Sequence, residues 1–140
     1  MATAGRDTVE VYVRKHSFTV GAPIQFDPEY AHISALEYAL GAVAADVVNG
    51  LRALARKRRT DLDAVEALVS GELNNPLTYL GVVGETGHPG IDRAAITVYL
   101  CSEASEDEIQ KLWEENLERS PLVRTFKAAI GLEVNLKISM

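Results

Sequence analysis

The chain has 140 residues, a formal net charge of −6 and 47% hydrophobic residues. This length fits one domain, so we expect residues 1–140 to fold as a single domain around a substantial hydrophobic core. The acidic balance argues against nucleic acid as a partner, and no apolar run reaches the roughly 20 residues that a membrane span needs.

Cysteine and histidine content limits the chemistry further. Cys101 is the only cysteine, which excludes an intramolecular disulfide and a metal site built from several cysteines. The histidines, His16, His32 and His88, have no metal-ligand spacing, so we expect no metal and no cofactor. Polar residues 6–8 interrupt any hydrophobic core of a signal peptide, and a cytoplasmic location is therefore expected.

The first part of the chain is rich in extended segments. Every second residue of 8–14 is valine, the period-2 pattern of a half-buried strand. Shorter extended runs follow at residues 18–20 and 24–26, before Asp27 and Pro28 end this region.

A long helix is predicted from Ser34 to about Arg58. Ser34 and Glu37 have the spacing of a capping box, in which each group satisfies the other's backbone amide. Small residues crowd the segment 37–51, and residues 39–45 contain no polar side chain. A helix that is apolar on every side is normally buried on every side, so we expect close packing around this segment.

The second part of the chain contains strands and two further helices. Alternating patterns predict strands at residues 64–73, 94–101 and 132–139. Serine caps predict helices at residues 105–118 and 120–131, and Gly84 to Gly90 forms a loop. Residues 77–83 fit a strand or a short helix. The order of elements predicts an α+β fold with largely antiparallel pairing.

Several motifs occur in an order that resembles a known family. A Phe-Asp-Pro run precedes the sequence Leu-x-x-Ala-Leu-Gly-Ala-x-x-Ala at residues 36–45. Ser-Gly-Glu-Leu at 70–73, Ser-x-x-Glu at 105–108 and Ser-Pro-Leu-Val at 120–123 follow. This order resembles the OsmC/Ohr family, named for osmotically induced protein C and the organic hydroperoxide resistance proteins. Ala-Asp-Val-Val at 45–48 looks closer to its YhfA-like branch.

The resemblance implies a fold and an activity. The fold is an intertwined homodimer, in which an antiparallel sheet wraps around a long central helix. Active members of the family are thiol peroxidases that act on organic hydroperoxides in the oxidative stress response. Their cysteines lie in a Gly-Ala-Cys pattern of the central helix and in a Cys-Pro-Val pattern that starts a later helix, and a Glu and an Arg assist.

Both cysteine positions are altered when the motifs are carried over. Gly-Ala-Cys falls on residues 41–43, which puts Val43 at the first position, and Cys-Pro-Val puts Ser120 at the second. The family's Glu is missing from its register, and Glu37 is interpreted as a helix cap. Arg6 and Arg14 are both candidates for the arginine.

These changes remove the groups that peroxide reduction requires. The reaction needs a thiolate that attacks the O–O bond and a second thiol that resolves the sulfenic acid to a disulfide. Val43 has no lone pair, and Ser120 fits an N-cap better than a nucleophile. Cys101 ends a strand away from both motifs, where a lone cysteine is usually a small apolar residue.

Asp46 stands out because it is an acid on an otherwise apolar helix. It fits a salt bridge, with Arg52 or with a basic residue of a second copy, better than an acid in a pocket. The candidate pocket residues are Val43, Asp46, Val47, Ser120, Leu122, Glu37 and Arg14.

The leading hypothesis is an OsmC-like homodimer that has lost thiol peroxidase activity and keeps an interface pocket for a small, partly apolar molecule. One alternative is a divergent hydroperoxide-detoxifying peroxidase that uses Cys101 or a partner's thiol. Another is a purely structural or interaction homodimer. The partners expected are a second copy and possible apolar ligands, with neither nucleic acid nor membrane.

Overall fold

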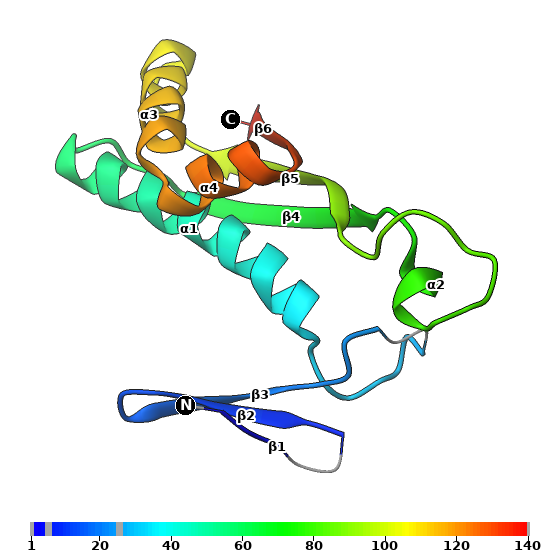
Figure 1. Ribbon diagram of the computed structural model, residues 1–140. Helices are drawn as coiled ribbons and strands as arrows, with labels where there is room; N and C mark the ends of the chain where they lie inside the picture. Colours follow the sequence, from blue (N-terminus) through cyan, green and yellow to red (C-terminus); the bar gives the residue numbers. More distant parts are fainter. Residues whose placement is uncertain (1, 5–6, 25–26, 140) are drawn as a thin grey trace. The chain divides into compact units, whose positions relative to one another are not determined.

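The computed structural model describes residues 2–4, 7–24 and 27–139. The chain forms two compact units, Met1–Ala39 and Leu40–Met140. Figure 1 labels the helices and strands of both. The expectation of one domain over residues 1–140 stays a prediction.

The first unit contains a three-stranded antiparallel sheet. Its strands are β1 (Ala2–Ala4), β2 (Val9–Val13) and β3 (His16–Val20), in the order β1-β2-β3. β2 and β3 form a hairpin in which Val13 pairs with His16. Both extended predictions for this region, at residues 8–14 and 18–20, are confirmed. Of the run 24–26, residues 25 and 26 lie outside the described residues, as does Arg6.

Arg14 lies in the two-residue turn of this hairpin. Its φ angle is 55°, the left-handed conformation that tight hairpin turns demand at this position. Arg14, one of the two arginine candidates, therefore has a local structural role.

The long helix α1 (Ala35–Lys57) begins with the predicted capping box. The Glu37 N–H donates to Ser34 Oγ at 3.2 Å, and the Ser34 N–H donates to Glu37 Oε1 at 3.0 Å. Glu37 is thus the helix cap expected from the sequence. Arg56 and Lys57 lie in the last turn, where cations complement the helix dipole.

One side of α1 is buried and another is open. The buried residues, at helical spacing, are Val43, Ala44, Val47, Leu51, Leu54 and Ala55. Gly41, Ala42 and Ala45 are exposed. Within the single chain the helix is therefore only partly buried, and burial of its remaining surface by a second copy stays a prediction.

The second unit contains a twisted sheet of β4 (Ala64–Leu73), β5 (Ile91–Cys101) and β6 (Gly131–Ser139), in that order. β4 and β5 are antiparallel, and they are joined by a segment that contains α2 (Pro76–Tyr79). The ambiguous run 77–83 thus begins as one short helical turn, and residues 84–90 are loop as predicted.

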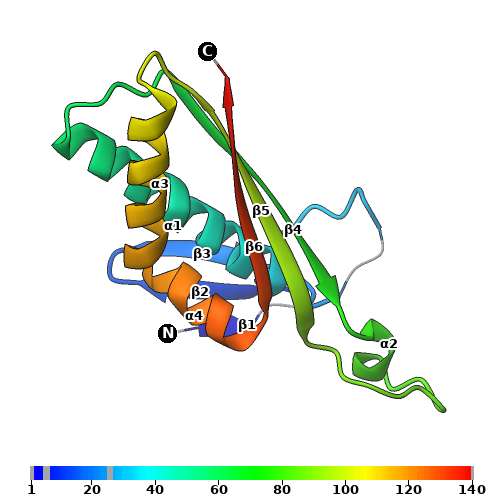
Figure 2. The same cartoon turned by 90° about the horizontal axis from the view of Figure 1, so that it is seen from above.

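The largely antiparallel pairing predicted from the sequence is confirmed for the pairs β1–β2, β2–β3 and β4–β5, whereas β5 and β6 are parallel. Two helices, α3 (Glu106–Arg119) and α4 (Pro121–Ala129), connect these strands. The connection returns the chain to the starting end of the sheet, so β6 runs in the same direction as β5. Figure 2 shows α3 and α4 on the same side of the sheet.

The core of the second unit lies between the sheet and its helices. Alternate residues of β5, namely Ala94, Ile96, Val98 and Leu100, are buried. They belong, with the exception of Ala94, to one cluster with the buried side of α1, with Val123 of α4 and with Ile109, Leu112 and Trp113 of α3. This core fixes α1 against the junction of α3 and α4, where the polar side chains of interest lie.

Candidate functional site

A short hydrogen bond links α1 to the start of α4. The hydroxyl of Ser120 donates to Asp46 Oδ2 at 2.5 Å. The backbone N–H of Leu122 donates to the same carboxylate oxygen at 3.3 Å. Of the predicted site residues, the structure therefore brings Asp46, Ser120 and Leu122 together.

Ser120 lies here because it joins two helices. Its backbone N–H donates to Asn116 O at 2.9 Å, which closes α3, and its Oγ accepts from the Val123 N–H at 3.2 Å, which caps α4. Pro121 occupies the first position of α4, where the missing N–H has no consequence. The N-cap predicted from the sequence is confirmed, and Ser120 is only 4% exposed.

Asn116 adds a second polar link between α3 and α1. Its Nδ2 donates to the carbonyl oxygen of Val47 at 2.8 Å, and the residue is 2% exposed. A Cβ at Gly50 would overlap Asn116 Oδ1, so this approach requires glycine in α1. The sequence contained a signal for Asn116, because it is the polar member of the buried stripe of α3.

These residues surround a small pocket of about 200 Å³. It is lined by Asp46, Gly50, Leu54, Asn116, Arg119, Ser120 and Pro121. Glu115 accepts from Arg119 at 2.8 Å and pairs with Arg58 at 2.7 Å, so both arginines have a carboxylate partner. We call this hollow the Asp46 pocket.

The lining of the Asp46 pocket does not include the other predicted residues. Val43 and Val47 are 1% and 0% exposed and pack in the core, and Val47 contributes only its carbonyl oxygen to the polar cluster. Glu37 and Arg14 belong to the first unit. No ion pair joins Asp46 to Arg52 within the described part of the chain, where Asp46 accepts hydrogen bonds instead. A cation from a second copy stays a prediction.

Cys101 is at the end of β5, paired with Ala64 of β4 and Ser139 of β6. It is a free, partly exposed thiol. Neither of its strand neighbours contributes to the Asp46 pocket.

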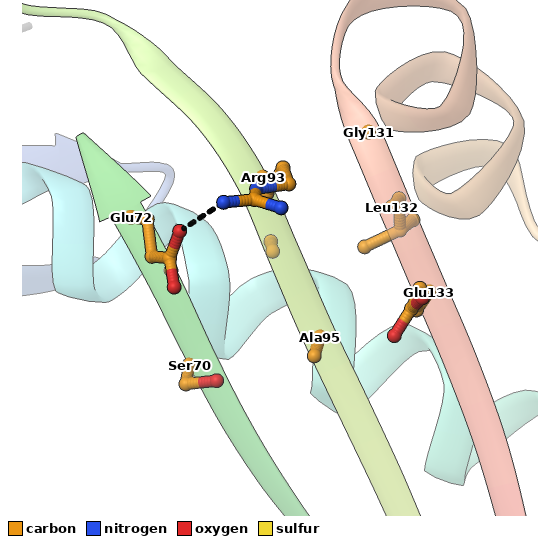
Figure 3. A pocket seen from close by; sticks show the side chains of 9 residues that line it. Ser70, Glu72, Arg93, Ala95, Gly131, Leu132 and Glu133 are labelled. Carbon is orange, nitrogen blue, oxygen red and sulfur yellow. Dashed lines mark hydrogen bonds and ion pairs between the residues drawn. The ribbon is translucent and has the colours of Figure 1, made fainter. Parts of the chain in front are cut away.

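A second hollow of about 340 Å³ lies over the sheet and was not expected from the sequence. Figure 3 shows its side chains from all three strands, including the ion pair of Arg93 with Glu72 at 3.1 Å. These two side chains are 76% and 69% exposed, so solvent screens their interaction. The small residues around them offer no buried polar group, and this sheet hollow is the weaker candidate site.

Across residues 2–4, 7–24 and 27–139, no three His, Cys, Asp or Glu side chains gather in a way that could hold a metal ion. Among the helices in the same ranges, none is both long and apolar enough to cross a membrane.

Comparison with known proteins gives a consistent result. The model of the family described as OsmC-like protein matches residues 27–135. No curated protein sequence matches. An OsmC-like protein from Mycoplasma pneumoniae has a similar structure, with a TM-score of 0.77 and 18% identity over 99% of this chain and 93% of that one.

Two named hydroperoxide resistance proteins are also similar in structure. The organic hydroperoxide resistance protein OsmC from Legionella pneumophila has a TM-score of 0.69 and 14% identity over 98% of this chain and 93% of that one. OhrB of Bacillus subtilis has a TM-score of 0.63 and 15% identity, with 98% and 95% covered. At these identities the likenesses show the shared α+β fold.

Proposed function

Because the chain belongs to the OsmC-like protein family, we propose that it is a homodimeric member without two-cysteine peroxidase activity. The Asp46 pocket then serves as a binding site for a small, partly apolar molecule. The hydrogen bond between Asp46 and Ser120 is the observation that carries this proposal.

The two cysteines that the resemblance implies must be able to touch, because they form a disulfide during the reaction. Ser120 stands at the second position. The α1 side chain that reaches Ser120 is that of Asp46, whereas Val43 is buried in the core. We therefore assign the first position to Asp46, nearly one helical turn beyond the Val43 that the motif pattern suggested.

A carboxylate and a hydroxyl cannot carry out thiol peroxidase chemistry. Neither oxygen-bearing group can become a sulfenic acid or form a disulfide, so the O–O bond has no sulfur nucleophile at this site. The pair instead forms a polar cluster that holds α1 against α4 and leaves a pocket beside it.

Two surfaces support the homodimer. Gly41, Ala42 and Ala45 form an exposed strip of small residues on α1, which allows another backbone to approach closely. The first unit exposes the apolar side chains of Val9, Val13 and Phe18, at 37%, 47% and 39%. A small three-stranded sheet that leaves such residues open gains stability when a second copy covers them.

The test of the lost activity is reduction of cumene hydroperoxide with dithiothreitol as the reductant. We expect no turnover above the uncatalysed rate in the wild type. Turnover at a rate comparable to a two-cysteine relative would contradict the proposal.

The assigned positions are tested in a Cys101→Ser background, so that only introduced thiols are present. Asp46→Cys with Ser120→Cys should form a disulfide on mild oxidation. Val43→Cys with Ser120→Cys should keep two free thiols. The reverse result would restore Val43 as the first position.

The dimer is tested by sedimentation equilibrium. Gly41→Leu should shift the protein to monomer, because the bulky side chain keeps the facing helix away. Ala53→Leu, an exposed position of the same helix, is the matched control and should leave the dimer intact. A monomeric wild type would contradict this part of the proposal.

One observation favours a second candidate function, a divergent hydroperoxide-detoxifying peroxidase that uses Cys101. The thiol is free and partly exposed. Mass spectrometry after peroxide exposure separates the two functions, since a peroxidase gives stoichiometric sulfenic acid or mixed disulfide at Cys101 and a binding protein stays unmodified.

A further inference from the structure

We propose that the Asp46 pocket recognises a small molecule through a protonated amine. This inference rests on the proposed binding function and names the chemical class of the ligand. It follows from the acceptor groups around the pocket that the described residues leave open.

One oxygen of the Asp46 carboxylate accepts hydrogen bonds within the described chain, and the other accepts none. Both of its hydrogen bonds, from Ser120 Oγ and from the Leu122 N–H, end on Oδ2. Within residues 2–4, 7–24 and 27–139, nothing donates to Oδ1 and no cation pairs with the group. A half-buried carboxylate in this state is stabilised by a charged donor.

Asn116 supplies a second acceptor. Its Nδ2 is held by the Val47 carbonyl, which fixes the amide, while its Oδ1 accepts no hydrogen bond from the described part of the chain. The residue is 2% exposed and lines the pocket together with Asp46. This amide oxygen is an open acceptor, and a ligand N–H group would supply a donor for it.

The guanidinium groups near the pocket are already engaged, because Arg58 and Arg119 share the carboxylate of Glu115. The guanidinium of Arg119 pairs with Glu115 at 2.8 Å and is 61% exposed. At the start of α4 the N–H groups of Leu122 and Val123 donate to Asp46 and Ser120, and Pro121 has no N–H. On the less exposed part of the lining the open groups are acceptors, Asp46 Oδ1 and Asn116 Oδ1, which favours a cationic donor over an anion.

The volume of the Asp46 pocket and its apolar lining residues limit the size and chemistry of the ligand further. A volume of about 200 Å³ is below the roughly 300 Å³ at which drug-sized sites begin. Leu54, Gly50 and Pro121 provide an apolar wall. A short alkyl chain with a terminal ammonium group combines both properties.

The experiment titrates the intact protein with n-butylammonium and n-butanol at constant ionic strength and follows backbone amide resonances by NMR. We expect saturable shifts at Gly50 and Leu122 with n-butylammonium. The alcohol should bind at least about tenfold more weakly, since a charged hydrogen bond contributes more than 1.4 kcal/mol.

Two variants test the role of the carboxylate. Asp46→Asn keeps an oxygen that can accept from Ser120 and should weaken n-butylammonium binding at least about tenfold. Glu118→Gln removes the same charge from an exposed position next to Arg119 and should bind like the wild type.

Three outcomes overturn the inference: no saturable shift, equal affinity for the alcohol, or unchanged affinity in Asp46→Asn. The first is also expected if a cation from a second copy occupies the pocket. If the protein neither turns over hydroperoxide nor binds n-butylammonium, only the amine inference fails.

Discussion

The Asp46 pocket and the sheet hollow contain the same kinds of residue and differ in how they are held. Each combines a carboxylate, an arginine, a serine and a glycine among its lining residues. In the Asp46 pocket the carboxylate accepts from two groups of the α3–α4 junction, and the neighbouring Ser120 and Asn116 are 4% and 2% exposed. In the sheet hollow the charged pair is mostly exposed and bridges two strands that are already hydrogen-bonded.

Residue type alone therefore does not distinguish a candidate site from an ordinary surface hollow. A buried polar group must be satisfied, so each one constrains the elements around it, whereas an exposed ion pair contributes little. Substitutions in the Asp46 pocket should therefore change stability much more than substitutions in the sheet hollow.

The largest effect is expected for Asn116→Ala. The change removes a buried hydrogen bond to the Val47 carbonyl and leaves a cavity, so the free energy of unfolding should fall by about 3 kcal/mol. Asn135→Ala, an exposed position on β6, is the matched control and should change it by less than about 0.5 kcal/mol. Urea unfolding measures both, and equal effects would remove the distinction between buried and exposed amides.

Gly50→Ala should lower the free energy of unfolding by about 2 kcal/mol, although alanine is the better helix former, because its Cβ overlaps Asn116 Oδ1. In an Asn116→Ala background the same change should stabilise the helix by about 0.5–1 kcal/mol. A double-mutant cycle from urea unfolding shows this change of sign. A penalty of the same size in both backgrounds would mean that Asn116 is not its cause.

Ser120→Ala should cost about 1.5 kcal/mol, because α4 loses its N-cap and Asp46 loses a donor. The comparison is Ser105→Ala, which removes the exposed capping box of α3 and should cost less, about 0.5–1 kcal/mol. Thermal unfolding of both variants gives the order, and a greater loss for Ser105→Ala would contradict it.

The smallest effect is expected in the sheet hollow. Arg93→Ala breaks the pair with Glu72, but both side chains are solvated, so the free energy of unfolding should change by less than about 0.5 kcal/mol. A loss above 1 kcal/mol in urea unfolding would place this hollow on a level with the Asp46 pocket.

Local sequence patterns were sufficient to predict most of the helices and strands. The valine alternation at residues 8–14, the Ser34–Glu37 capping box and the Ser120–Pro121 helix start each act within a few residues, and the structure has all three. The parallel pairing of β6 with β5 was missed, because the direction of a strand depends on how the preceding helices cross the sheet.

The candidate site could be predicted from the sequence only in part. The composition shows that the chain has one cysteine, and local patterns identify Ser120 as a helix cap and Asp46 as the acid on an apolar helix. The contact of Asp46 with Ser120, the burial of Val43 in the core and the place of Asn116 in the pocket became visible in the folded chain alone. These contacts join residues about seventy positions apart, and such pairing is set by the packing of α1 against α3 and α4 rather than by any local pattern.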